Sequence, residues 1–268
     1  MTTANRVVLY LQDETNLAAL PGSIPPLTHL NLSSFHFGYD RGGQPYIHLN
    51  DDPPNQSTVW PAMQQAQKAG CKVLAMLGGA GGAYGQLFSN YSAFYGLLKQ
   101  TLQTYNLDGV DLDIEEQVAL ADVQKLIKDL RKDFPNGSIS AAPVAMALWT
   151  GSDPLSGLDW SKLESDIDWF NVQFYSGYGS LSSPADYMKI VNAGYPVGKV
   201  LAGHLTNPGN GSGYVAISTV VSTITSLIGV YGNTLGGAMG WEQYNALDAK
   251  GKVDPAKWCK DMYKALTS

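Results

Sequence analysis

Short runs of apolar residues recur along the whole chain and alternate with segments whose apolar residues follow helical spacing. The runs are continuously apolar rather than strictly alternating, which is typical of strands that are buried on both faces. Eight such strands are predicted, at Arg6–Leu11, Thr28–Ser34, Lys72–Leu77, Gly109–Ile114, Ser138–Ala142, Trp169–Tyr175, Lys199–Gly203 and Gly237–Trp241.

The segments between these runs carry the periodicity and the end signals of helices. Leu126, Ile127 and Leu130 share one helical face, and Ser183-Pro184 is typical of a helix start. The predicted helices are Trp60–Ala69, Ala93–Tyr105, Ala121–Phe134, Pro184–Ala193, Ser218–Ile228 and Pro255–Leu266. Repeated alternation of strand and helix with eight strands favours a parallel (β/α)8 TIM barrel.

The chain is expected to form a single barrel domain over residues 1–268, with no large insertion domain. Its first crossover is expected to be irregular, because residues 13–27 include three prolines and leave little room for a helix. A doubly wound open sheet is the alternative architecture. No Gly-x-Gly-x-x-Gly turn follows the first predicted strand to support that alternative.

Charge and composition narrow the possible partners. The net charge is −6 and no basic cluster is longer than Arg131-Lys132, so neither a nucleic acid nor an anionic membrane is an expected partner. Cys71 and Cys259 make no disulfide framework and have no neighbouring ligands at metal-site spacing, so no metal or other cofactor is expected. The N-terminal residues do not resemble a signal peptide, which predicts a cytoplasmic chain, or a secreted one whose leader has been removed.

Three carboxylates occupy alternate positions along the predicted fourth strand and the residue that directly follows it. Asp111, Asp113 and Glu115 are spaced i, i+2 and i+4, so all three are expected to point into the barrel and toward its C-terminal rim. Mutual repulsion should raise the pKa of at least one of them, which is the condition for a general acid at neutral pH. A divalent-metal site and a purely structural cluster are the alternatives. The first lacks a companion His or acidic strand end, and the second is energetically expensive.

The run from Asp108 to Glu115 resembles the Asp-Gly-x-Asp-x-Asp-x-Glu signature of glycoside hydrolase family 18, which contains chitinases and endo-β-N-acetylglucosaminidases. Other segments resemble further parts of that family. They are Met76-Leu77-Gly78-Gly79 at the third strand, Asn171-Val172-Gln173-Phe174-Tyr175 at the sixth and Gly237-Ala238-Met239-Gly240-Trp241 at the eighth. The resemblance therefore extends from the first strand to the last.

The resemblance implies a retaining, substrate-assisted mechanism, in which the 2-acetamido group of the sugar is the nucleophile and forms an oxazolinium intermediate. Glu115 would protonate the glycosidic oxygen and later activate water, while Asp113 would hold the acetamido N–H and share a proton with Asp111. Tyr175 would hydrogen-bond the acetamido oxygen. Substrate binding is expected at Gln173, Trp241, Asp108, Gly78, Gly79 and Asn207, whereas Tyr10 is expected to pack rather than to contact the substrate.

Two loop regions resemble the fungal endo-β-N-acetylglucosaminidases within the family. One runs from Ile47 to Pro54 and the other from Leu205 to Gly211. The implied activity is hydrolysis of the β-1,4 bond between the two core N-acetylglucosamines of an N-glycan, so the expected partner is an N-glycan or a glycoprotein. An endochitinase would share the whole catalytic set, and a catalytically inactive sugar-binding barrel is a further alternative. A monomer is the expected oligomeric state.

Overall fold

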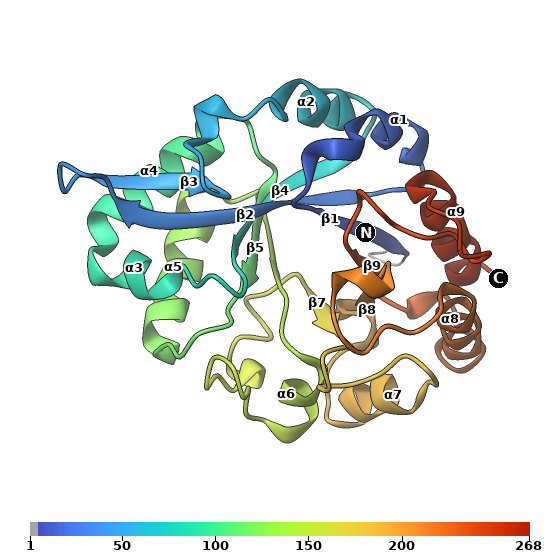
Figure 1. The fold of residues 1–268 in the computed structure, drawn as a ribbon. Helices are drawn as coiled ribbons and strands as arrows, with labels where there is room; N and C mark the ends of the chain where they lie inside the picture. The colour runs from blue at the N-terminus through green and yellow to red at the C-terminus, as the bar shows by residue number, and fades with distance from the viewer. Residues whose placement is uncertain (1–4) are drawn as a thin grey trace.

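The computed structural model describes residues 5–268. Residues 1–4, on which the prediction about a signal peptide partly rests, lie outside the described residues. Eight parallel strands form a closed barrel that is surrounded by helices, which confirms the predicted (β/α)8 architecture (Figure 1). The barrel closes because β1 pairs with both β2 and β9. The barrel strands are β1 (Arg6–Leu11), β2 (His29–Tyr39), β4 (Lys72–Gly78), β5 (Gly109–Asp113), β6 (Ser138–Ala141), β7 (Trp169–Gln173), β8 (Val200–Leu205) and β9 (Gly237–Trp241).

A ninth strand was not predicted. β3 (Pro45–Leu49) pairs antiparallel with the outer half of β2, and β2 runs on to Tyr39 instead of ending at Ser34. The two strands form a hairpin that projects beyond the barrel (Figure 1). β3 starts with a proline and alternates Tyr46 and His48 with buried residues, so its sequence lacks the continuous apolar character of the barrel strands.

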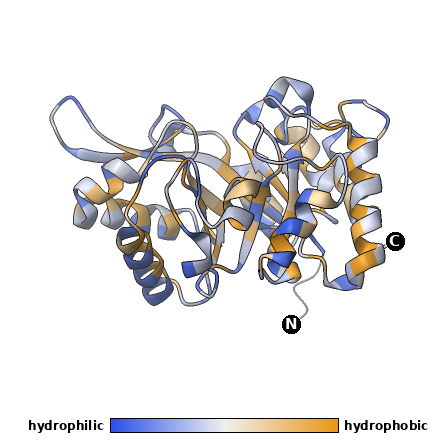
Figure 2. Ribbon diagram, turned by 90° about the horizontal axis from the view of Figure 1, so that it is seen from below, coloured by the Kyte–Doolittle hydropathy of each residue, from blue (hydrophilic) through white to orange (hydrophobic). Residues whose placement is uncertain are grey.

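The helices lie outside the barrel and pack their apolar faces against its strands. They are α1 (Leu20–Ser23), α2 (Trp60–Lys68), α3 (Tyr84–Ser89), α4 (Tyr91–Thr104), α5 (Leu120–Asp133), α6 (Ala145–Thr150), α7 (Ala185–Asn192), α8 (Ile217–Tyr231) and α9 (Pro255–Leu266). Hydrophobic and hydrophilic segments alternate along them, as amphipathic helices require (Figure 2). The short helices α3 and α6 were not predicted. The helix expected to begin at Pro184 begins at Ala185, because Pro184 occupies the capping position.

The first crossover is irregular, as the sequence indicates. It contains the 3-10 helix η1 (Glu14–Ala19) followed by the single turn of α1. Further 3-10 turns occur at η2 (Pro54–Gln56), η3 (Trp160–Lys162), η4 (Val197–Lys199), η5 (Pro208–Asn210) and η6 (Gly232–Thr234). Within the described part of the chain, no helix is both long and apolar enough to cross a membrane.

Two apolar layers hold the fold together. The larger one lies between the strands and the surrounding helices, and it includes Leu9, Leu112 and Phe170. The smaller one comprises Val8, Tyr10, Leu74, Met76, Ala142, Trp169, Leu201 and Met239, with Trp241 packed against it. These residues come from strands all round the barrel, and they are the layered side chains that fill the interior of such barrels. Because this layer fills the barrel interior, a pocket can open only at the ends of the strands.

Candidate active site

A pocket of about 900 Å³ opens at the C-terminal ends of the strands, and carboxylates from β5 and the segment after it line one side of it. Asp111 and Asp113 lie on β5, and both are buried. The strand ends at Asp113, one residue earlier than predicted, so Glu115 lies in the connection that follows. Strand alternation turns Asp111 and Asp113 toward the barrel interior, and Glu115 lines the pocket close to Asp113.

Asp111 lies deepest of the three and is surrounded by hydrogen-bond donors. It accepts bonds from the Tyr10 hydroxyl at 2.6 Å, the Ser140 hydroxyl at 2.6 Å and the Asn171 amide at 2.9 Å. Burial raises the pKa of Asp111, while these three bonds lower it. Tyr10 packs within the barrel interior and does not line the pocket, and its hydroxyl also takes part in this network.

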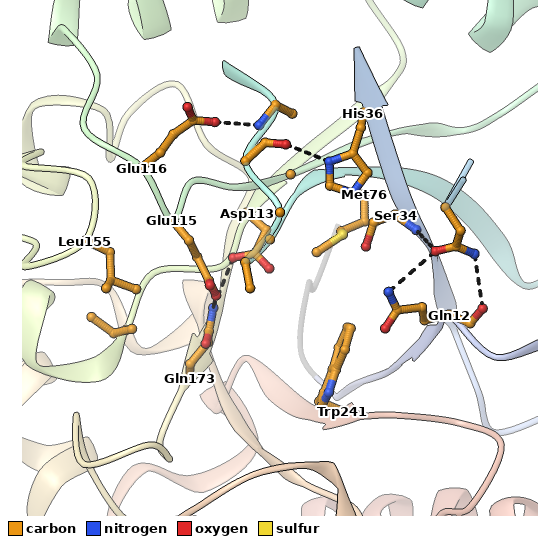
Figure 3. A pocket seen from close by; sticks show the side chains of 18 of the residues that line it. Gln12, Ser34, His36, Met76, Asp113, Glu115, Glu116, Leu155, Gln173 and Trp241 are labelled. Atoms are coloured by element: carbon orange, nitrogen blue, oxygen red, sulfur yellow. Dashed lines mark hydrogen bonds between the residues drawn. The ribbon is translucent and has the colours of Figure 1, made fainter. Parts of the chain in front are cut away.

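The side chain of Gln173 forms hydrogen bonds with both Asp113 and Glu115. Its amide nitrogen donates to Asp113 at 3.0 Å, to Glu115 at 3.3 Å and to the backbone oxygen of Ala142 at 2.8 Å (Figure 3). The amide thereby holds Asp113 and Glu115 side by side at the pocket wall. The resemblance implies that Asp111 and Asp113 share a proton. Among the described residues, no hydrogen bond joins these two carboxyl groups directly.

The electrostatic environment favours a protonated group in this cluster. Burial raises the pKa of Asp113 well above its usual value, and the charges of Glu115 and Asp111 add to the effect. Burial also raises the pKa of Glu115, against the effect of the Gln173 hydrogen bond. The pKa of Tyr175 is raised well above its usual value by burial and then by the neighbouring carboxylates, so its hydroxyl stays protonated. A protonated carboxyl beside an ionised one is suited to acid catalysis.

Trp241 stands at the end of β9 and faces the carboxylates across the pocket (Figure 3). Its ring is tilted against Tyr10, with 5.5 Å between the ring centroids. Gly78 and Gly79 lie at the end of β4 and also line the pocket. Gly78 has a φ of 93°, and a Cβ there would collide with the backbone oxygen of Asp113. A glycine is therefore required where β4 passes β5.

Two residues expected to bind substrate do not reach the pocket. Asp108 precedes β5 at the opposite end of the strand, where it accepts hydrogen bonds from the Val73 backbone N–H at 2.9 Å and the Gln67 amide at 2.8 Å. Its place is structural, because a residue at the N-terminal end of a barrel strand lies away from the rim. Asn207 instead bonds the backbone of Asn245 and Gly209. Asn210 lines the pocket in its place.

Several pocket residues were not predicted, and most of them come from β2 and the loop after β3. They are Gln12, Ser34, His36, His48, Asn50, Asp51 and Glu116. Ser34 and His36 are two residues apart on the extension of β2, so they share a face of the strand. The predicted strand ended at Ser34, so His36 was not expected to share a strand face with Ser34. Within residues 5–268, no group of three or more His, Cys, Asp or Glu side chains is placed to hold a metal ion.

Comparisons with known proteins agree with this geometry. A sequence model of the glycosyl hydrolases family 18 matches residues 6–206. Chitinase 2 of Rhizopus oligosporus is 31% identical over 249 residues, which cover 80% of this chain and 44% of that protein. Chitinase 1 of Candida albicans is 31% identical over 79% of this chain and 46% of its own length. The chain thus spans less than half the length of the curated relatives that it matches.

Two solved structures combine a similar fold with substantial identity. A fungal endo-β-N-acetylglucosaminidase of family 18 has a TM-score of 0.85 and 36% identity, covering 97% of both chains. The chitinase ChiC of Aspergillus fumigatus has a TM-score of 0.84 and 35% identity, covering 91% of this chain and 93% of its own. The motif, the pocket and these matches together show that the chain belongs to glycoside hydrolase family 18.

Proposed function

We propose that this chain is a retaining endo-β-N-acetylglucosaminidase that hydrolyses the β-1,4 bond between the two core N-acetylglucosamines of N-glycans. The observation that carries the proposal is the Gln173 amide, which holds Asp113 and Glu115 together at the wall of a pocket that also contains Tyr175 and Trp241. This arrangement provides one acid and one adjacent carboxylate. A nucleophile has to come from elsewhere, and the substrate's own acetamido group supplies it.

In the first step, the carboxyl of Glu115 gives its proton to the glycosidic oxygen as the bond from that oxygen to the anomeric carbon breaks. The carbonyl oxygen of the 2-acetamido group attacks the anomeric carbon and forms the oxazolinium ring. Asp113 accepts a hydrogen bond from the acetamido N–H and stabilises the positive charge, while the Tyr175 hydroxyl donates to the acetamido oxygen. Trp241 packs under the apolar face of the same sugar.

In the second step, the carboxylate of Glu115 removes a proton from water. The water oxygen attacks the anomeric carbon from the side that the leaving group occupied, and the oxazolinium ring opens to restore the acetamido group. Two displacements at one carbon give net retention. The raised pKa of Glu115 suits both steps, since the group must be protonated before the first and ionised before the second.

The choice of substrate is supported by the chemistry of the pocket lining. Gln12, Asn50 and Asp51 contribute polar side chains to it, and Trp241 is the one tryptophan among the described residues that line the pocket. A branched mannose-rich glycan presents many hydroxyls to such a polar surface, whereas a long chitin chain is better served by a row of exposed aromatic rings. The similarity to the fungal endo-β-N-acetylglucosaminidase supports the same choice.

Hydrolysis of β-1,4-linked N-acetylglucosamine polymers is the second candidate function. The chitinase ChiC is nearly as similar as the endo-β-N-acetylglucosaminidase, and the curated relatives are chitinases. The same carboxylates would serve both reactions, so the difference depends on how the loops around the pocket accommodate sugars beyond the cleaved bond.

The experiment that separates them is incubation of the protein with ribonuclease B and, in parallel, with chitin oligomers, followed by mass spectrometry of the products. We expect ribonuclease B to lose its glycan and to retain one N-acetylglucosamine. Shortening of the chitin oligomers without this change would favour the second candidate. The Glu115→Gln variant is the control. Its rate should fall about 10²–10⁴-fold, the usual contribution of general acid–base catalysis, while circular dichroism shows an unchanged fold.

A further inference from the structure

The loop after β4 forms one wall of the pocket and has almost no side chains of its own. Residues 79–83 are Gly-Ala-Gly-Gly-Ala, and all of them line the pocket. A segment of this composition has large conformational freedom when it is unrestrained. Its shape at the pocket must therefore be held by contacts from other parts of the chain.

Glu116 binds the end of this loop and the first turn of α3, which follows it. One oxygen of its carboxylate accepts the backbone N–H groups of Ala83 at 2.5 Å and Tyr84 at 2.6 Å, and the other accepts that of Gly85 at 3.0 Å. Hydrogen bonds to an ionised acceptor are about twice as strong as those between neutral groups. A Cβ at Gly82 or Gly85 would lie 3.1 or 3.0 Å from the carboxylate, so glycines leave room for its close approach.

His36 holds the same loop from the side of β2. Its Nδ1 lies 2.6 Å from the backbone oxygen of Gly82. Because a carbonyl oxygen can only accept, Nδ1 is the donor. The glycine-rich wall is thus held at two points by side chains that both belong to the pocket.

Glu116 follows Glu115 directly in the chain, and neither residue lies in a strand or a helix. β5 ends at Asp113 and α5 begins at Leu120. On the far side of Glu116, Gln117 donates to the backbone of Leu155 at 2.8 Å and the Val118 N–H donates to Ser156 at 3.2 Å. The position of the backbone at Glu115 therefore depends on the hydrogen bonds that residues 116–118 form.

We propose that Glu116 is a positioning residue, whose attachment to the backbone of residues 83–85 holds the carboxyl of Glu115 in place beside Gln173. The assignment rests on the proposed role of Glu115 as the acid. One rigid peptide plane joins the two residues, so movement of Glu116 is passed directly to Glu115. A displacement of about 1 Å at a reacting group can lower the rate about 10²-fold.

Release of Glu116 has a second consequence. Burial is the main cause of the raised pKa of Glu115. If the segment from residue 115 to residue 119 is freed, Glu115 gains contact with water and its pKa falls toward the ordinary value. A loss of thermal stability alone would not change this titration.

Three variants test the proposal on the whole chain. Glu116→Ala removes both acceptor oxygens and with them all three hydrogen bonds. Glu116→Gln keeps one oxygen, which is enough for the bonds to Ala83 and Tyr84. Asp254→Ala is the matched control, because Asp254 accepts the Lys257 N–H at 2.9 Å as the cap of α9 and does not line the pocket.

We expect kcat of Glu116→Ala to fall about 10–100-fold with a much smaller change in KM, and Glu116→Gln to recover most of the loss. The carboxyl of Glu115 is titrated in parallel by carbon-13 NMR of glutamate-labelled protein, with the signal assigned from Glu115→Gln. Its pKa should fall in Glu116→Ala and stay unchanged in Asp254→Ala. A Glu115 titration in Glu116→Ala that matches the unaltered protein would overturn the proposal.

The titration needs no turnover. If the unaltered protein hydrolyses neither ribonuclease B glycans nor chitin oligomers, the proposed function fails, and the pKa of Glu115 still decides whether Glu116 positions it. If Glu116→Ala and Asp254→Ala lower kcat equally, the effect of Glu116 is one of general stability and the proposal is wrong.

Discussion

Asp111 shows at the scale of a single residue how the protein accommodates a carboxyl group in its interior. Its side chain is fully buried, and three donors from three different strands surround it. An unpaired buried carboxylate would be strongly destabilising, so these donors are what make the position tolerable. Tyr10 is the donor from β1. The position of Tyr10 in an apolar run indicated only that its ring packs inside the barrel. Nothing in that local pattern indicated a partner for its hydroxyl.

The contribution of Tyr10 can be measured with Tyr10→Phe, which removes only the hydroxyl. We expect the free energy of unfolding to fall by about 1.5–3 kcal/mol, the usual range for a hydrogen bond to a charged group. Urea unfolding monitored by circular dichroism is the measurement. Tyr263→Phe is the control, since Tyr263 is 45% exposed, and it should change stability by no more than about 0.5 kcal/mol. Equal effects of the two substitutions would contradict the assignment.

The point at which each strand ends determines which side chains line the pocket. Their existence could be predicted because a barrel strand is apolar on both faces, and that pattern depends only on local sequence. Their ends depend on pairing with neighbours. β2 continues to Tyr39 because β3 pairs with its outer half, and this brings His36 and His48 to the pocket wall. No local pattern could indicate that pairing.

Close packing between β7 and β8 requires a glycine at position 203. Gly203 on β8 lies opposite Gln173 of β7, and a Cβ there would collide with the backbone oxygen of Val172 and approach the Met239 side chain to 2.5 Å. The glycine therefore allows β7 and β8 to approach each other at the level of the amide that holds the two carboxylates.

Gly203→Ala is expected to lower the free energy of unfolding by about 1–3 kcal/mol, the usual cost of overpacking. It should also lower the rate of hydrolysis, because β7 carries Gln173. Gly96→Ala is the matched control. Gly96 lies within α4, and a Cβ there would meet nothing within 4 Å. That substitution should stabilise the protein by about 0.5–1 kcal/mol and leave the rate unchanged. Thermal unfolding and initial rates distinguish the two outcomes.

At the scale of the whole molecule, contacts between the barrel and its helices link stability to pH. His204 lies on β8, and its Nε2 accepts the indole N–H of Trp258 on α9 at 3.2 Å. The imidazole is therefore neutral, with its proton on Nδ1. Burial lowers the pKa of His204 to about 4. Between about pH 4 and pH 6.5, the unfolded chain thus binds a proton at this residue while the folded protein does not.

The sign of the effect follows from this difference in proton binding. The contribution of His204 to stability is fully present above pH 6.5 and is lost as the pH falls toward 4. We expect the fall in the free energy of unfolding between pH 7 and pH 4.5 to be about 2–3 kcal/mol smaller in His204→Gln than in the unaltered protein. Urea unfolding at the two pH values measures it. The buried carboxylates are common to both proteins, so an unchanged pH dependence would refute the role of His204.

The sequence by itself determined the eight strands and the spacing of Asp111, Asp113 and Glu115, because strand alternation and apolar runs are local properties. The tertiary structure decided what those carboxylates meet. Tyr10 and Gln173 lie far from them in the sequence, and closure of the barrel brings them within hydrogen-bond distance. Asp108 directly precedes β5, so its place at the opposite end of the strand from the pocket was already implied by the predicted strand, and the structure adds its bonds to Val73 and Gln67. Contacts of this kind depend on register, tilt and loop path, which no local pattern specifies.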